Sequence, residues 1–202
     1  MKYNLSGFFN EYKKRYPQFK DIVNDYERQL KELKITMNHD VNNVKDEDQY
    51  YQQLFQLPMD SFYIIDWNVE QALKTATKYY KNGPNMKFNV PIVYDAVRKD
   101  AIVQSYLDEA SRNNNPIILG YHPGITHPNI IVIDGNHRVA SRARQGVNDI
   151  YGYFLSPKMH LECMMTNLDQ LLYKIHHNLY KHVIQSQGGP LKEIEYDDEF
   201  IS

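Results

Sequence analysis

The chain has 202 residues, of which 42% are hydrophobic and 24% charged, a composition that excludes an intrinsically disordered protein. Its 23 basic and 25 acidic residues give a formal net charge of -2, so it lacks the basic excess of a dedicated duplex-DNA-binding protein. A single cysteine, Cys163, excludes an intrachain disulfide and a multi-cysteine zinc site. The first residues carry no apolar signal-peptide segment and no stretch has the length of a membrane span, so we expect a cytoplasmic protein without a membrane partner.

Residues 1–58 have the pattern of a helical N-terminal arm. Apolar residues recur at steps of three and four, which places them on one helix face: Phe19, Ile22, Val23, Tyr26, Leu30 and Leu33. A further short helix is expected from Tyr50 to Leu57, ended by Pro58.

An aromatic run, Phe8, Phe9, Tyr12 and Tyr16, precedes that stripe. Such rings can stack on bases of single-stranded nucleic acid. Their helical spacing favours packing in a core or an interface instead.

Residues 59–157 mix strands and helices. The expected elements are a strand over 61–67, a helix over 68–80, a helix from Pro91 to about 112, strands over 116–121 and 129–133, a helix over 137–144 and a strand over 150–155. These elements do not alternate as regular βαβ units, which predicts an α+β fold in which helices flank a small mixed sheet. Residues 158–202 are expected to form one long helix, apolar from Leu161 to Val183, followed by an acidic tail.

The segment from Asp134 to Arg138 is the strongest functional signal. A buried strand runs into Gly135, where the absence of a Cβ permits a tight turn and close approach of a ligand. The following helix start offers free N–H groups to an anion, and Asn136, His137 and Arg138 add donors. Asp134 is the adjacent acid, able to cap the helix, bind a metal ion or act as a base. A plain alternative stays open, because Asp-Gly-Asn is a common turn composition and Arg138 and Arg142 could form a solvated helix face.

The strand Pro116-Ile117-Ile118 followed by the segment Val132 to Ala140, Val-Ile-Asp-Gly-Asn-His-Arg-Val-Ala, resembles the ParB/sulfiredoxin superfamily, also called the ParB-like nuclease domain. The resemblance covers roughly residues 60–156. In that family a Gly-x-His-Arg or Gly-Glu-Arg-Arg box opens a helix and binds nucleotide phosphates. Asn136 stands where sulfiredoxins carry their catalytic cysteine, so sulfinic-acid reduction is not expected. Chromosome-partitioning members carry Glu and Arg where this chain has Asn136 and His137, so centromere binding is not expected either.

The resemblance implies a nucleotide or similar phosphate ligand at Gly135, Asn136, His137 and Arg138. The accompanying reaction would be phosphotransfer or nucleotide hydrolysis, with Asp134 and His137 as catalytic candidates. A nucleoside triphosphate or diphosphate with Mg²⁺, held by Asp134, is the implied cofactor. Two other functions stay open: a non-catalytic module whose outer helices bind a protein partner or a second copy, and a nucleic-acid-binding protein or nuclease.

Overall fold

A computed structural model describes residues 1–37, 49–123 and 129–188, and they form two compact units. The first unit combines both ends of the chain, residues 1–67 and 164–202, and the second unit comprises residues 68–163. These boundaries differ from those expected at residues 58/59 and 157/158. The mixed α+β class is confirmed, with two small sheets where the sequence predicted one. No helix of the described residues is long and apolar enough to cross a membrane.

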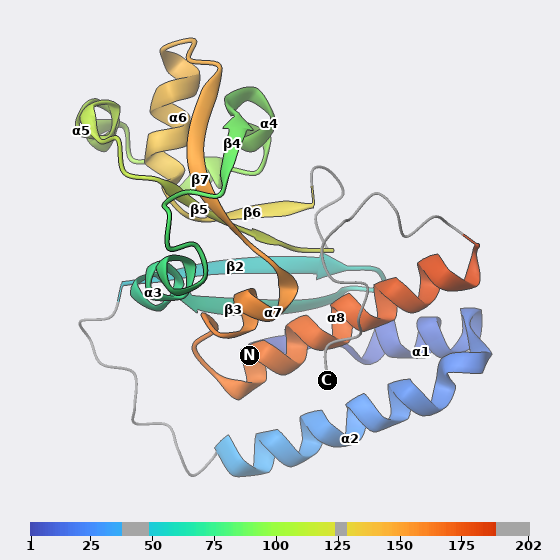
Figure 1. Cartoon of the computed structure of the whole chain (residues 1–202). Helices are drawn as coiled ribbons and strands as arrows, with labels where there is room; N and C mark the ends of the chain where they lie inside the picture. The colour runs from blue at the N-terminus through green and yellow to red at the C-terminus, as the bar shows by residue number, and fades with distance from the viewer. Residues whose placement is uncertain (38–48, 124–128, 189–202) are drawn as a thin grey trace. The chain divides into compact units, whose positions relative to one another are not determined.

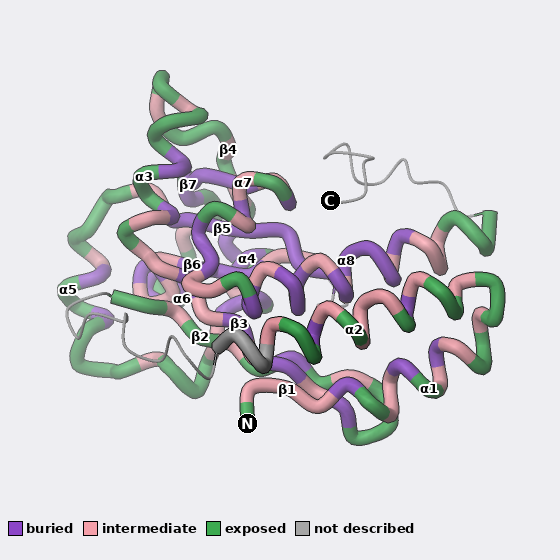
Figure 2. Tube along the Cα trace, turned by 90° about the horizontal axis from the view of Figure 1, so that it is seen from below, coloured by how far each residue is buried: buried purple, intermediate pink, exposed green. Residues whose placement is uncertain are grey.

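The described residues of the first unit form the helices α1, α2 and α8 (Figure 1) and a three-stranded sheet in the order β1-β3-β2. Its elements are β1 (Tyr3–Asn4), α1 (Ser6–Arg15), a 3₁₀ turn (Pro17–Phe19), α2 (Lys20–Met37), β2 (Tyr50–Leu57), β3 (Ser61–Asn68) and α8 (Asn167–Ser186). Helix α8 is buried along most of its length, as the tube coloured by burial shows (Figure 2). Its centre therefore acts as the core of this unit.

A partly buried ion pair holds Lys2, the residue before β1, against α8. Lys2 Nζ lies 2.6 Å from Asp169 Oδ1 and 2.9 Å from Asp66 Oδ2. Asp169 also completes a capping box with Thr166 at the start of α8. The ion pair and the cap offset part of the cost of burying the Asp169 carboxylate, and burial still raises its pKa.

Of three predictions for the ends of the chain, one is confirmed and two are wrong. The helix carrying the Phe19–Leu33 stripe is confirmed as α2. The expected helix from Tyr50 to Leu57 is wrong, because this segment is β2, a neighbour of β3 in the sheet. The single long C-terminal helix is also wrong: it is two helices, α7 and α8, separated at 162–166. The capping box of Thr166 starts α8 afresh, and Met164 forms a bridge to Trp67. The acidic tail lies outside the described residues.

The second unit is built on a four-stranded mixed sheet in the order β4-β7-β5-β6. Its elements are α3 (Val69–Tyr79), β4 (Met86–Asn89), α4 (Val90–Asp95), 3₁₀ turns (Lys99–Ala101 and Gln104–Tyr106), α5 (Leu107–Arg112), β5 (Ile117–Tyr121), β6 (Ile130–Asp134), α6 (Asn136–Arg144), β7 (Asp149–Leu155) and α7 (Pro157–Leu161). β5 pairs parallel with β7 and antiparallel with β6. β5 is buried throughout because it lies inside the sheet, and it places Ile117 against Gly135 at the start of α6.

The expected helix from Pro91 to about 112 is wrong as a single element. It is divided into α4, two 3₁₀ turns and α5. At the break, the Val103 N–H donates to His137 Nε2 at 3.0 Å instead of to a helical carbonyl. A tertiary contact thus replaces the helical hydrogen bond that the periodicity predicted.

Two adjacent histidines of α8 make the first unit sensitive to acid. Burial lowers the pKa of His176 and of His177 from 6.5 to about 4. The unfolded chain therefore binds protons that the folded state does not, so stability is complete above pH 6.5 and falls as the pH drops toward 4. We expect the first unit to lose roughly 2 kcal/mol per histidine between neutral pH and pH 5.

Urea unfolding followed by the fluorescence of Trp67, the single tryptophan, measures this loss, since Trp67 is buried in the first unit. His177→Phe keeps the ring that stacks on Tyr173 and removes the titrating group. Its pH dependence should be clearly smaller than that of the parent chain, with the remainder coming from His176 and from His182, whose pKa burial also lowers. A variant with the full pH dependence would show that His177 is not a source of the acid sensitivity.

Candidate functional site

The predicted motif lies at one strand-to-helix junction of the second unit. β6 ends at Asp134, Gly135 forms the turn, and α6 begins at Asn136. Gly135 has a φ of 99°, in the left-handed region that favours glycine. No side chain of the described residues caps α6, so its first N–H groups are left for another partner.

The space beside Gly135 is filled by protein rather than left open for a ligand. A Cβ at this position would lie 2.5 Å from Ile117 Cγ2 and 3.1 Å from Arg138 Nη2. Glycine is thus required here by its backbone conformation and by packing. A ligand therefore cannot approach the Gly135 Cα from the side where a Cβ would lie. We expect it to approach from the side of the backbone N–H groups.

Arg138 is buried, with 7% of its surface exposed, and its guanidinium faces protein groups. Nη1 donates to the carbonyl oxygens of Asn115 (2.7 Å) and Pro116 (2.9 Å), and Nη2 donates to Asp134 Oδ2 (2.5 Å). The guanidinium donors that the motif predicts for a phosphate are therefore already hydrogen-bonded to protein groups. Since Arg138 neutralises Asp134, the carboxylate does not make the helix start repel an anion.

Arg142, one turn later, has a similar structural role that the sequence does not predict. Its Nη1 donates to the Ser111 carbonyl at 3.0 Å and its Nη2 to Asn114 Oδ1 at 2.6 Å. Together the two arginines hold the segment between α5 and β5 against α6. The alternative prediction, that Arg138 and Arg142 form a solvated helix face, is therefore wrong for both residues.

His137 and Asn136 are half-buried at the helix start. His137 Nε2 accepts from the Val103 N–H, and its ring packs edge-on against Tyr106 with centroids 5.6 Å apart. Asn136 Nδ2 donates to the Val132 carbonyl at 2.9 Å, while its buried Oδ1 has no hydrogen-bond partner among the described residues. The turn thus offers the N–H groups at the start of α6 to a ligand, whereas the buried Asn136 Oδ1 is closed to one.

A groove of about 690 Å³ runs along α6 within the same unit. Its walls include two exposed cations, Lys99 and Arg144, with Lys99 Nζ lying 5.0 Å from the centre of the Tyr94 ring. Ile102 and Gln104, which flank Val103, lie at the edge of this groove. The volume falls within the roughly 300–1,000 Å³ typical of small-molecule sites.

Lys99 and Arg144 were not among the predicted site residues. Arg144 lies seven positions after His137 and therefore on the same helix face, so the sequence spacing could have predicted its place near the motif. Lys99 has no local signal, since the chain between α4 and α5 brings it there.

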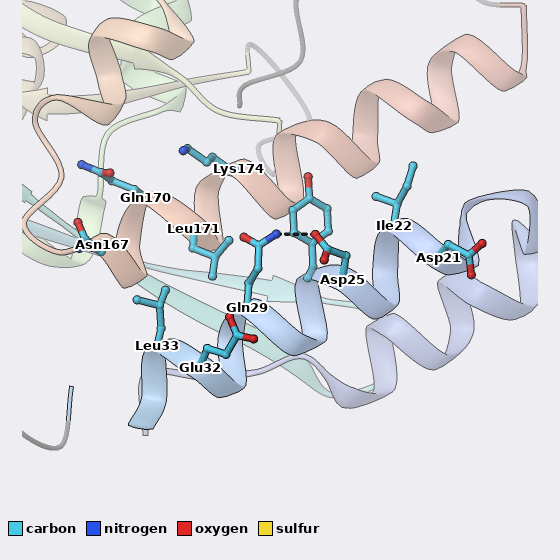
Figure 3. Close-up of a pocket in the computed structure, with 11 residues that line it drawn as sticks. Asp21, Ile22, Asp25, Gln29, Glu32, Leu33, Asn167, Gln170, Leu171 and Lys174 are labelled. Carbon is cyan, nitrogen blue, oxygen red and sulfur yellow. Dashed lines mark hydrogen bonds between the residues drawn. The ribbon is translucent and has the colours of Figure 1, made fainter. Parts of the chain in front are cut away.

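A second concavity, of about 800 Å³, lies between α2 and α8 in the first unit. Figure 3 shows its lining residues, which include Asp21, Ile22, Asp25, Gln29, Glu32 and Leu33 on α2, and Asn167, Gln170, Leu171 and Lys174 on α8. The lining includes three carboxylates, those of Asp21, Asp25 and Glu32, and one ammonium group, that of Lys174, so it carries more acid than base. Such a surface disfavours phosphate, and the groove beside α6 is the better candidate for an anion.

The described residues contain no group of three or more His, Cys, Asp or Glu side chains placed to share a metal ion. Asp134 Oδ2 is paired with Arg138, and the Asp134 side chain is 34% exposed. Mg²⁺ binds through as few as one carboxylate when phosphates and water complete its shell. The described residues at this turn thus offer a single carboxylate, already paired with Arg138, which would supply at most one protein ligand to a metal ion that arrives with a nucleotide.

Comparison of the chain with protein-family models, curated proteins and solved structures found no match. The ParB/sulfiredoxin resemblance therefore stays a prediction carried by the motif.

Proposed function

We propose that the second unit binds a phosphorylated small molecule through the start of α6, a nucleotide being the class that the ParB/sulfiredoxin resemblance implies. The observation that supports it is the uncapped start of α6 directly after β6. Helix N-termini bind phosphate through their free N–H groups and their partial positive charge. The pairing of Asp134 with Arg138 supports the proposal further, because it cancels the one negative charge at the turn.

The groove along α6 is proposed to hold the rest of the ligand. Lys99 and Arg144 would attract further phosphate oxygens, and Asn148 and Gln104 offer amide groups for a base or sugar. His137 stands one turn before Ala140, which lines the groove, so the helix start and the groove share a face of α6.

The location of binding is tested by amide chemical shifts in a titration with ATP, CTP, GTP and inorganic phosphate, with and without Mg²⁺. We expect the largest shifts at Gly135, Asn136, His137 and Arg138. Lys99→Ala and Arg144→Ala should each weaken nucleotide binding by about three- to five-fold, the range for an exposed charge contact. Lys81→Ala, another exposed lysine of the same unit outside the groove, should change nothing.

Catalysis is a separate part of the proposal and rests on Asp134 and His137. His137 Nε2 is engaged with Val103, which leaves Nδ1 as the atom able to hold or move a proton. A bound Mg²⁺ would supply charge stabilisation at the phosphates. Phosphate release across a nucleotide panel, compared with His137→Gln, tests this part: no release in either protein leaves a binding function only.

The rival function is a non-catalytic interaction module. It is favoured by one observation: Arg138 and Arg142 use their guanidinium donors on carbonyls of the chain. If millimolar nucleotide and phosphate do not change the amide chemical shifts of residues 135–138, the motif has only a structural role. The non-catalytic interaction module is then the better supported function.

A further inference from the structure

A small pocket lies between α1 and α8 in the first unit, distinct from the concavity between α2 and α8. Its volume is about 180 Å³. Residues at steps of three and four on each helix line it, namely Phe8, Glu11, Tyr12 and Arg15 on α1 and His176, Leu179, Tyr180 and Val183 on α8, with Tyr16 and Pro58 beside them. The aromatic run of the N-terminal arm thus forms both packing and an accessible pocket.

Apart from Glu11 and Arg15, the walls of this pocket are largely aromatic and aliphatic, and two of the polar groups beside it are already hydrogen-bonded. The Tyr12 hydroxyl donates to the Leu179 carbonyl at 2.9 Å, and the Tyr63 hydroxyl lies 2.5 Å from His176 Nδ1. Burial also keeps His176 neutral at physiological pH by lowering its pKa to about 4. A cavity of about 150 Å³ with apolar walls can hold a benzene ring, so one aromatic ring matches this volume.

Two opposite charges line the same pocket. Glu11 and Arg15 are one helical turn apart on α1. Glu11 is half-buried and makes no hydrogen bond or ion pair among the described residues, and Arg15 lies over the Tyr16 ring at 5.7 Å. The Glu11 carboxylate thus has no cation partner among the described residues and is available to pair with a bound cation.

We propose that this pocket binds a free aromatic amino acid. The ring would enter between Phe8, Tyr12 and Tyr180, the ammonium would pair with Glu11 and the carboxylate with Arg15. The two charged groups of an amino acid share one carbon atom, and side chains one turn apart on a helix are near enough to hold both. An aromatic residue inside a polypeptide lacks these charges and would leave Glu11 unpaired.

Four small ligands separate the contributions, measured by isothermal titration calorimetry at pH 7.5 with the full chain. L-phenylalanine carries the ring and both charges, phenethylamine lacks the carboxylate, 3-phenylpropionate lacks the ammonium, and L-alanine lacks the ring. We expect L-phenylalanine to bind at least about five-fold more tightly than phenethylamine or 3-phenylpropionate, and L-alanine not to bind. Equal affinity for all three aromatic ligands, or binding of none, overturns the proposal.

Variants place the ligand in this pocket. Glu11→Gln should weaken the binding of L-phenylalanine by roughly ten-fold and leave the affinity for 3-phenylpropionate unchanged. Arg15→Gln should weaken the binding of both ligands. Lys14→Gln changes an exposed charge of the same helix outside the pocket and is the matched control. Val183→Phe should fill the half-buried pocket wall and abolish binding while the circular-dichroism melt stays cooperative. A Val183→Phe protein that folds and still binds L-phenylalanine would place the ligand elsewhere and refute the assignment.

Discussion

Replacing Arg138 by alanine is expected to lower the stability of the second unit by roughly 3 kcal/mol, as breaking a buried ion pair from one side does. The change removes both contacts to the Asn115 and Pro116 carbonyls and leaves Asp134 without its counter-charge. Hydrogen exchange of the β5 and β6 amides measures the loss within this unit. Trp67 fluorescence reports the first unit separately.

Arg142→Ala is the matched control on the same helix. Arg142 is more exposed and has no carboxylate partner among the described residues, so its loss should cost about 1 kcal/mol. Arg138→Lys, which keeps the charge without the planar fork, should fall between the two. Equal effects of Arg138→Ala and Arg142→Ala would mean that the pair with Asp134 contributes nothing to stability.

Gly135→Ala should destabilise the second unit by roughly 2–5 kcal/mol, combining the cost of a left-handed non-glycine residue with the cost of overpacking. The new methyl group would lie within 2.5 Å of Ile117 Cγ2. Gly146, which follows α6, has a φ of 69°, and no atom of the described residues lies within 4 Å of the place a Cβ would take there, so Gly146→Ala carries the backbone cost alone. The difference between the two variants in chemical denaturation isolates the steric part.

The double variant Gly135→Ala with Ile117→Ala removes most of the clash. Its destabilisation should be smaller than the sum of the two single changes, since contacting residues are not additive. Strictly additive changes in the free energy of unfolding would show that Ile117 does not clash with a side chain at position 135.

Much of the second unit could be predicted because its patterns are local. The strands over 117–121, 130–134 and 149–155 are apolar runs bounded by turn residues, and Asn68 caps α3 by accepting from the Gln71 N–H at 2.8 Å. The position of the motif at a strand-to-helix turn was predictable for the same reason. These assignments need only neighbouring residues.

The errors occur where distant residues decide the structure. Tyr50–Leu57 is a strand because it lies beside β3, across a turn in which Met59 and Asp60 both have positive φ. Neither residue is a glycine or asparagine, so the hairpin has no typical sequence signal. By contrast, the Thr166 to Asp169 capping box was present in the sequence and would have divided the C-terminal helix.

The candidate site was predictable in place but not in detail. The carbonyls that Arg138 and Arg142 bind belong to residues 111–116, which approach α6 only in the folded unit. A phosphate-binding arginine and a carbonyl-binding arginine are identical in the sequence. Only the partners distinguish them, so the ligand has to be sought at the N–H groups of α6 and at Lys99 and Arg144.

Burial protects the only thiol of the chain from chemical modification in the folded protein. Cys163 is fully buried, its Sγ donates to the Met159 carbonyl at 3.3 Å, and burial raises its pKa to about 12. Because the thiolate is the reactive form, thiol-directed oxidants and alkylating reagents do not reach a reactive Cys163 in the native state. Covalent dimers through this residue require prior opening of the structure, and the rate at which a thiol reagent modifies Cys163 therefore times that opening.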